Sequence, residues 1–340
     1  MAEAWGIHIP AAVGSDPVEG GFISLGWPAL GNIFALTPDR HVFKRLVAQS
    51  YPEKKPGAIP VDAGTLFKFA FEVKADDLIV YPSKHDRMVH IGRATGKKWH
   101  DGTGASWRAD YPNHQGVEWL AHEPRDAFSQ SALYEIGSFI TLFRIREHTA
   151  EFAAKATPGL SYSTPIETAE APLSDDLTAQ QASQVAEETT ADFIVRRLHG
   201  SLSGYDFEHF TAHLLECMGY SARVSEKSGD GGVDVIAHTD QLGFQPPIIK
   251  VQCKRQTGQV GEPEVSQLLG TLGEGEYALF VTLGSYSRQA RIRERNNPRL
   301  RLLDGEDLVQ TILVHYDRLA PRYRVMLPLK RIYVPDPVSG

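Results

Sequence analysis

Hydrophobic and polar residues follow different patterns in the two halves of the chain. In the first half, short apolar runs separated by turn residues predict strands at residues 5–9, 22–27, 78–81, 89–94 and 142–145. Apolar residues at helical spacing predict helices at 40–49 and 65–71. This pattern predicts a mixed β-barrel with peripheral helices, which we place at residues 1–150.

The second half alternates between helical and extended patterns. Apolar runs predict strands at residues 233–238, 248–253, 278–282 and 300–303. Amphipathic spacing predicts helices at residues 207–218, 262–273, 287–296 and 306–317. Strands that alternate with helices indicate an α/β domain with a mixed central sheet flanked by helices, which we place at residues 188–340.

The segment between these regions has a different composition. Residues 151–187 are rich in Thr, Ser, Ala and Pro and carry six acidic residues against one lysine. Because such a segment has too few large apolar residues to bury, we expect a flexible acidic linker that turns helical near its end. Most of the net charge of −7 lies here, and both flanking regions are nearly neutral. The overall charge therefore does not exclude a nucleic-acid partner.

Other sequence features narrow the class of protein. No run of about 18 apolar residues occurs, so no membrane-spanning helix is expected. The first residues, Met-Ala-Glu-Ala-Trp, lack the pattern of a secretory signal. Cys217 and Cys253 do not form a metal-binding spacing, and two lone thiols fit a reducing compartment. We therefore expect a cytoplasmic protein without a membrane partner.

Three segments of the second half carry residues suited to catalysis. A glycine-rich turn leads into a strand that begins near Asp234, and a later strand contains Gln252 and Lys254. Side chains alternate along a strand, so Gln252 and Lys254 share one face. An amide and an ammonium on a buried strand need polar partners to offset desolvation. If the strand of Asp234 is a neighbour, the three groups meet at one end of the sheet.

These groups match the requirements of phosphodiester hydrolysis. That reaction needs a hard cation, oxygen ligands for the cation, and a group that orients or deprotonates water. Asp234 and Gln252 supply oxygen ligands, the backbone carbonyl of Cys253 can add another, and Glu208 can bind directly or through water. Taken singly, each residue has an ordinary explanation: an aspartate can cap a turn, and a lysine on a strand can be solvated.

The order of the motifs resembles the Mrr-type restriction endonuclease domain of the PD-(D/E)xK nucleases. The resemblance covers residues 188–315 and rests on Phe-Glu at 207–208, Met-Gly-Tyr at 218–220, Gly-Asp-Gly-Gly-Val-Asp at 229–234, Val-Gln-Cys-Lys-Arg at 251–255 and Leu-Asp-Gly at 303–305. It implies that Asp234 and the weaker ligand Gln252 bind Mg²⁺, that Lys254 positions water, and that Glu208 is a supporting acid. Because Gln252 stands where the general pattern has an acid, the number of metal ions stays open.

The first half contains all five tryptophans and a weaker resemblance. Residues 76–83, 91–94 and 111–119 are similar to segments of the EVE branch of the PUA-like superfamily, whose members bind modified bases in an aromatic pocket. Asp76 stands where that family has a glycine, and Pro82 replaces a polar residue. The resemblance implies pocket residues Trp27, Tyr81 and Ser83. The alternative is that these aromatic residues form the core.

Together these features predict a modification-dependent (type IV) restriction endonuclease. The first domain would recognise modified cytosine in double-stranded DNA, and the second would cut nearby with Mg²⁺. Cleavage of both strands makes a homodimer plausible. One alternative is an anti-phage effector nuclease whose first domain senses a small ligand or a protein, and cleavage of unmodified DNA only with that signal would favour it. The other is a catalytically silent DNA-binding module, which metal-dependent nicking would exclude.

Overall fold

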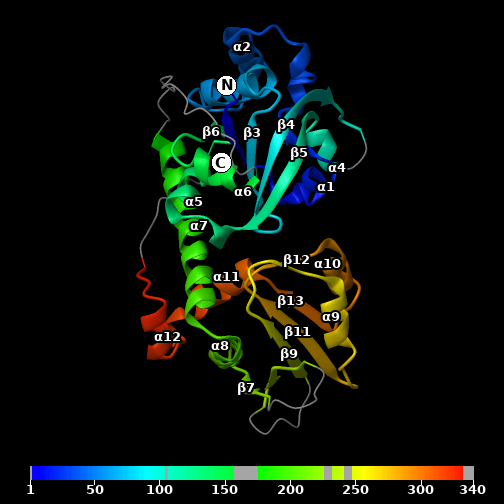
Figure 1. Ribbon diagram of the computed structural model, residues 1–340, viewed down its shortest axis with the longest axis vertical. Helices are drawn as coiled ribbons and strands as arrows, with labels where there is room; N and C mark the ends of the chain where they lie inside the picture. The colour runs from blue at the N-terminus through cyan, green and yellow to red at the C-terminus, as the bar shows by residue number, and fades with distance from the viewer. Residues whose placement is uncertain are drawn as a thin grey trace. The chain divides into compact units, whose positions relative to one another are not determined.

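The computed structural model describes residues 2–103, 106–138, 140–156, 175–225, 232–240 and 247–331 (Figure 1). Its contacts divide the chain into two compact units. The N-terminal unit comprises Met1–Glu188 together with Tyr333–Gly340, and the C-terminal unit comprises Thr189–Ile332. Each unit has its own sheet and its own buried core.

The N-terminal unit is built on a six-stranded sheet in the order β2-β5-β4-β3-β1-β6. Its strands are β1 (Ala4–Ile7), β2 (Phe22–Leu25), β3 (Leu78–Pro82), β4 (Met88–His100), β5 (Asn113–Pro124) and β6 (Leu142–Arg144). Strands β1 and β3 are parallel, and the other neighbours are antiparallel. The predicted strands correspond to β1, β2, β3, β4 and β6, whereas β5 was not predicted.

The expected closed β-barrel is wrong for this unit. Among the described residues the sheet is open, because β2 pairs only with β5 and β6 pairs only with β1. Both outer strands are short, with four residues in β2 and three in β6. Helices cover both faces of the sheet, so apolar residues are buried without closure of a barrel.

Two helical layers enclose this sheet. The longer helices are α2 (Arg40–Ser50), α3 (Ala58–Phe67), α5 (Gln130–Ile136) and α6 (Thr149–Ala156), and short α1 (Asp16–Glu19) and α4 (Ser106–Asp110) accompany them. One face packs against α2 and α3 through a core that contains Trp5 and Phe43. The other face packs against α5 and α6 through a core that contains Leu78 and Phe152.

The loop before β3 holds a buried carboxylate. Asp77 is 3% exposed and accepts hydrogen bonds from the indole Nε1 of Trp5 at 2.9 Å and the amide of Glu3 at 2.8 Å. The amide of Lys74 donates a third bond at 2.9 Å. The preceding Asp76 has φ +68°, a left-handed conformation that favours glycine and tolerates Asp. This explains in physical terms why a glycine would suit the position of Asp76.

Part of the segment expected to be a linker is helical. Helix α7 (Asp175–Ser201) runs through the boundary between the units, and residues 157–174 lie outside the described part of the chain. Ala, Gln and Glu are frequent in residues 175–188 and have high helix propensity, which accounts for the helix. None of the helices among the described residues combines the length and apolar character needed to cross a bilayer.

The C-terminal unit contains a five-stranded mixed sheet in the order β13-β11-β9-β8-β7. Its strands are β7 (Ser221–Val224), β8 (Val235–His238), β9 (Ile248–Lys254), β11 (Glu276–Thr282) and β13 (Leu300–Leu303). Strands β9, β11 and β13 are parallel, and β7, β8 and β9 are successively antiparallel. Two short strands, β10 (Gln259–Val260) and β12 (Ser285–Tyr286), form a separate parallel pair.

Helices cover both faces of this sheet, as the predicted α/β architecture requires. The end of α7, α8 (Gly204–Cys217), α11 (Gly305–His315) and α12 (Pro321–Met326) contribute to one core. Helices α9 (Glu262–Leu269) and α10 (Arg288–Arg295) contribute to the other (Figure 1). The parallel strands β9, β11 and β13 end at the same edge, and this edge carries the catalytic candidates of β9.

Candidate active site

The two faces of β9 have different roles. Val251 is fully buried in the core that includes α8, and Cys253 packs against the same core. Gln252 and Lys254 alternate with these residues and therefore point to the opposite face, where α9 packs. The periodicity of the sequence predicts this division. It brings an amide and an ammonium to one face at the end of the strand.

Asp234 is held beside this end of β9 by its own backbone. Its amide donates to the carbonyl of Val251 at 2.8 Å, and its carbonyl accepts from the amide of Ser225 at 2.8 Å. Its carboxylate Oδ2 accepts a hydrogen bond from the amide of Cys253 at 2.7 Å. Because Cys253 lies between Gln252 and Lys254, this bond fixes the carboxylate next to both.

Gln252 has an unsatisfied buried oxygen. Its Oε1 is inaccessible to solvent and has no hydrogen-bond partner among the described residues. Gly232, with φ +89°, lies so close that an added Cβ would be 3.1 Å from Nε2 of Gln252. A buried amide oxygen without a partner is unusual in a folded protein. The carboxylate of Asp234 is hydrogen-bonded to the amide of the next residue, Cys253, so the same end of β9 has two kinds of oxygen that can bind a cation.

Lys254 forms an ion pair that the sequence analysis missed. Its ammonium contacts the carboxylate of Glu264, and each side chain is about one-third exposed. The other oxygen of Glu264 accepts a hydrogen bond from the amide of Gly261 at 3.0 Å, at the start of α9. A glutamate three residues after a helix cap is a recognisable pattern, but this pattern does not indicate that the glutamate pairs with Lys254 of β9.

Glu208 lies in the second turn of α8, and its carboxylate interacts electrostatically with the thiol of Cys253. Burial raises the pKa of Cys253, and the negative charges of Asp234 and Glu208 raise it further. Both carboxylates therefore lie near the end of β9. They approach it from different elements, since Asp234 precedes β8 and Glu208 belongs to α8.

This donor set fits a hard cation with few charged ligands. Within the described ranges, no three His, Cys, Asp or Glu side chains gather in a group able to hold a metal ion. The predicted ligands, however, include the amide oxygen of Gln252 and the carbonyl of Cys253 beside the carboxylates of Asp234 and Glu208. Amide and carbonyl oxygens are accepted ligands of Mg²⁺ and Ca²⁺. The unpaired Oε1 of Gln252 is the observation that supports this fit.

Other polar residues near the motif have structural partners. The guanidinium of Arg255 donates to the carbonyl of His199. His213, on the same helix as Glu208, accepts a hydrogen bond from the amide of Ala320 at 3.0 Å. Asp230, in the glycine-rich turn, lies outside the described residues.

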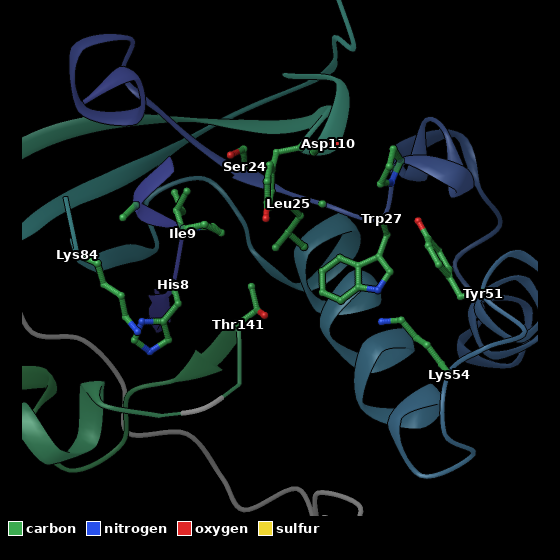
Figure 2. Close-up of a pocket in the computed structure, with 15 residues that line it drawn as sticks. His8, Ile9, Ser24, Leu25, Trp27, Tyr51, Lys54, Lys84, Asp110 and Thr141 are labelled. Carbon is green, nitrogen blue, oxygen red and sulfur yellow. The ribbon is translucent and has the colours of Figure 1, made fainter. Parts of the chain in front are cut away.

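Of the three residues expected to form a base pocket, Tyr81 and Ser83 lie next to each other, and Trp27 lies at a separate cavity (Figure 2). Trp27 is half-buried and lines a cavity of the N-terminal unit. Tyr81 is fully buried in the core between the sheet and α2 and α3, and burial raises its pKa to about 12. Ser83 is 4% exposed and is not among the residues that line the cavity. Only Trp27 of the three therefore faces this space.

Comparison with protein families assigns the C-terminal half. Residues 199–312 match the family profile Mrr_cat, described as "Restriction endonuclease". The C-terminal half is an Mrr-type restriction endonuclease domain. The matched residues include Glu208, Asp234, Gln252, Lys254 and Glu264. Residues 10–146 match a domain of unknown function, DUF8426, so the EVE resemblance of the N-terminal half stays a prediction.

One curated relative agrees with this assignment of the restriction endonuclease domain, and two solved structures are similar to the chain. The chain is 26% identical over 206 residues to the type IV methyl-directed restriction enzyme EcoKMrr of Escherichia coli (strain K12), and the alignment covers 58% of this chain and 65% of that protein. Among solved structures, MspJI restriction endonuclease in complex with a 27-mer oligonucleotide is similar with 17% identity and a TM-score of 0.34, over 79% of this chain and 65% of that one. The DNA modification-dependent restriction endonuclease AspBHI has 15% identity and a TM-score of 0.32, over 91% of this chain and 78% of that one.

Proposed function

We propose that the chain is a Mg²⁺-dependent DNA endonuclease that acts on DNA containing modified cytosine. The observation that carries the hydrolytic part is the meeting of Asp234, Lys254 and the unpaired Oε1 of Gln252 at one sheet end. This meeting occurs inside the domain that matches the restriction endonuclease family.

The proposed roles follow from the position of each group. Asp234, Gln252 and the carbonyl of Cys253 would hold the cation, and Glu208 would support it directly or through water. When bound, the cation would supply positive charge against the phosphate. Lys254 orients the attacking water, whose oxygen forms a new bond to phosphorus as the bond to one ester oxygen breaks. The water passes a proton to solvent, and the leaving ester oxygen takes up a proton from solvent. Glu264 holds the ammonium of Lys254 at the edge of the site.

The dependence on modified cytosine is assigned to the N-terminal unit. Support comes from the alignment with a relative whose name describes it as methyl-directed. The N-terminal unit also contains a cavity lined by aromatic and polar side chains, separate from the nuclease site. A division into a recognition unit and a cutting unit would place cleavage beside the modified base and, with two chains, on both strands.

Cleavage of matched plasmids tests this proposal. The protein is incubated with Mg²⁺ and with plasmids that are unmodified, methylated or hydroxymethylated at cytosine. We expect cleavage of one modified plasmid and loss of cleavage by at least about 1,000-fold in Asp234→Ala and Lys254→Ala, because each removes a group that acts on the transition state.

A matched control separates loss of the site from loss of the fold. Asp240 follows the opposite end of β8, so Asp240→Ala should cut at the rate of the unaltered protein. Retained cleavage by purified Asp234→Ala would reject the site assignment. Equal cleavage of all three plasmids would reject the dependence on modification and leave the nuclease assignment intact.

A further inference from the structure

The last part of the C-terminal unit has a concentration of positive charge. Residues 318–331 contain Arg318, Arg322, Arg324, Lys330 and Arg331 and no acidic residue, in a chain whose net charge is −7. This segment includes α12, at the red end of the chain in Figure 1, and lies beyond residue 312, where the match to the restriction endonuclease family ends. The motifs of the active site therefore do not account for it.

Helix α12 is fixed to the nuclease unit through its apolar side. Tyr323 and the following Leu327 are buried in the core that includes α8. The ring of Tyr323 lies 5.0 Å from the ring of Phe210 in α8. Because the apolar residues of this amphipathic segment face the core, Arg322 and Arg324 are exposed on the opposite side. The helix therefore presents its arginines on a rigid support.

Three of these basic side chains are exposed and form no ion pair with a residue that the structure describes. They are Arg322, Arg324 and Lys330. The guanidinium of Arg322 lies 4.6 Å from the ring centroid of Tyr323 and donates to its hydroxyl at 3.0 Å. An aromatic ring and a hydroxyl orient a guanidinium but do not cancel its charge.

Two more arginines extend this surface. The guanidinium of Arg197, in α7, donates to the carbonyl of Met326 at 3.3 Å, and that of Arg318 donates to the carbonyl of Cys217 at 3.0 Å. Carbonyl oxygens carry no net charge, so both arginines keep their full positive charge. We call Arg197, Arg318, Arg322, Arg324, Lys330 and Arg331 the α12 patch.

Acidic residues close to the α12 patch do not balance its charge. Asp317 forms an ion pair with Arg331 at 2.6 Å. The charges of Asp206 and Glu216, both in α8, act on Tyr323, and Glu216 also contacts His213 at 3.3 Å. Three carboxylates therefore lie near six basic side chains, and the surface keeps a net positive charge. A local excess of this kind attracts anions even on an acidic protein.

The apolar residues of α12 argue against a membrane as the partner. Basic helices that lie on membranes insert a broad apolar face. In α12, Tyr323 is buried and Met326 is half-buried, so Val325, 77% exposed, is the one large apolar side chain of the helix that is fully available. Exposed arginines with little apolar surface suit a chain of phosphates instead, because a guanidinium donates two hydrogen bonds to one phosphate.

We propose that the α12 patch binds the phosphate backbone of duplex DNA, independently of base sequence and modification, and holds the substrate on the nuclease unit. The inference rests on the proposed function, which makes DNA the substrate. Helix α8 connects the two regions, because it contains Glu208 of the candidate active site and contacts α12 through Phe210. Phosphate contacts position a duplex, whereas reading of the modified base is assigned to the other unit.

Arg324 and Lys330 allow a test that does not disturb the fold. Both are exposed, and within the described ranges neither side chain has a hydrogen bond or an ion pair to lose. Arg324→Lys keeps the charge and is the conservative variant. Arg295 of α10 is the matched control, since it is also an exposed arginine without an ion pair in the described part of the chain, and α10 covers the opposite face of the sheet.

The experiment measures how duplex binding depends on salt. Full-length protein carrying Asp234→Asn, without Mg²⁺, is titrated into a fluorescein-labelled unmodified duplex, and anisotropy is followed at several NaCl concentrations. Each phosphate contact contributes about −0.9 to the slope of log affinity against log salt. The double variant Arg324→Ala, Lys330→Ala should therefore lower the magnitude of the slope by about 1.8 and the affinity about tenfold. Arg324→Lys and Arg295→Ala should keep both, and a methylated duplex should give the same differences.

Three results would overturn the inference. They are an unchanged slope in the double variant, an equal loss of affinity in Arg295→Ala, and binding to phosphatidylglycerol vesicles that needs Arg324 and Lys330 while duplex binding does not.

The proposed nuclease function is judged separately, by cleavage with Asp234 intact and Mg²⁺ present. There the double variant should raise KM and leave kcat unchanged, because the α12 patch holds DNA without touching the reacting phosphate. A lower kcat with an unchanged KM would contradict the proposal. If the unaltered protein cuts no plasmid but duplex binding still depends on Arg324 and Lys330, the nuclease proposal fails and the assignment of the patch stands.

Discussion

The two units of this chain bury polar groups in different ways. In the C-terminal unit, Gln252 and Lys254 of β9 lie beside Asp234, which precedes the neighbouring strand β8, and within the described part of the chain the Oε1 of Gln252 has no hydrogen-bond partner. In the N-terminal unit, Asp77 is saturated with hydrogen bonds inside the core, and Ser24 faces a cavity built from distant segments. The first arrangement depends on strand register, whereas the second depends on tertiary packing of loops.

This difference determines which of the two sites can be recognised from the sequence. Fixed spacing along a strand makes the nuclease motif visible in the sequence, and a family match follows it. The cavity has no such spacing, and the family that matches there has no assigned function. All five tryptophans belong to the N-terminal unit, so tryptophan fluorescence follows the unfolding of that unit alone. The comparison can therefore be tested one unit at a time.

The largest expected effect is on the stability of the N-terminal unit. Asp77→Ala leaves the indole of Trp5 and the amides of Glu3 and Lys74 without their acceptor. We expect a loss of about 3 kcal/mol in the free energy of unfolding, because buried donors are left unsatisfied. Urea titration followed by tryptophan fluorescence measures it. The exposed neighbour is the control: Asp76→Asn should change the midpoint little, and an equal loss there would contradict this account.

The next effect concerns the nuclease unit and the unpaired oxygen. Gln252→Leu should lower the cleavage rate about 100-fold, or about 2.7 kcal/mol, while the stability changes little, because Oε1 has no hydrogen-bond partner to lose among the residues that the structure describes. Gln252→Glu adds a charged ligand and should lower the Mg²⁺ concentration needed for half-maximal cleavage. A large loss of stability in Gln252→Leu, or an unchanged Mg²⁺ requirement in Gln252→Glu, would argue against a ligand role.

Sequence periodicity was sufficient to predict the central strands of the nuclease unit. The apolar runs of β9, β11 and β13 and the alternation of Gln252 with Cys253 follow directly from period-two patterning. It did not reveal Glu264, because the ion pair with Lys254 depends on where α9 packs. Strand β7 was also missed, since its four residues are half-buried or exposed at the sheet edge and lack an apolar run.

Sequence patterning failed in the N-terminal unit for another reason. Strand β5 begins with Asn113, His114 and Gln115, all of which are buried. The side chain of Asn113 accepts from the amide of Ile33 and donates to the carbonyl of Gly31, each at 3.2 Å. Because tertiary contacts hold the side chain of Asn113, a buried strand can begin with polar residues that are typical of a loop. The cavity was not predicted for the same reason, because its lining residues come from distant segments of the chain.

A pH effect should distinguish the N-terminal unit from the nuclease unit. Burial lowers the pKa of His8 from 6.5 to about 4 in the folded protein, so the unfolded chain binds more protons between these values. Stability contributed by neutral His8 is present above pH 6.5 and is lost as the pH falls toward 4. At pH 5 the loss should be about 2 kcal/mol relative to pH 7. Urea titrations followed by tryptophan fluorescence at both pH values should show a smaller difference in His8→Asn, and an equal difference would exclude His8 as the cause.

The smallest effect that we predict concerns the contact that sequence analysis missed. Glu264→Gln keeps the size of the side chain but removes the charge that holds the ammonium of Lys254. Because Lys254 itself remains, we expect cleavage to slow only about tenfold, with little change in the Mg²⁺ requirement. Glu262 lies in the same helical turn and pairs with Arg293 instead, so Glu262→Gln is the matched control. If Glu264→Gln instead raises the Mg²⁺ requirement as strongly as loss of Gln252 does, Glu264 binds the cation and the site has a third carboxylate. If it cuts at the rate of Glu262→Gln, the pair with Lys254 is a surface contact, and Asp234, Gln252 and Lys254 form the site without it.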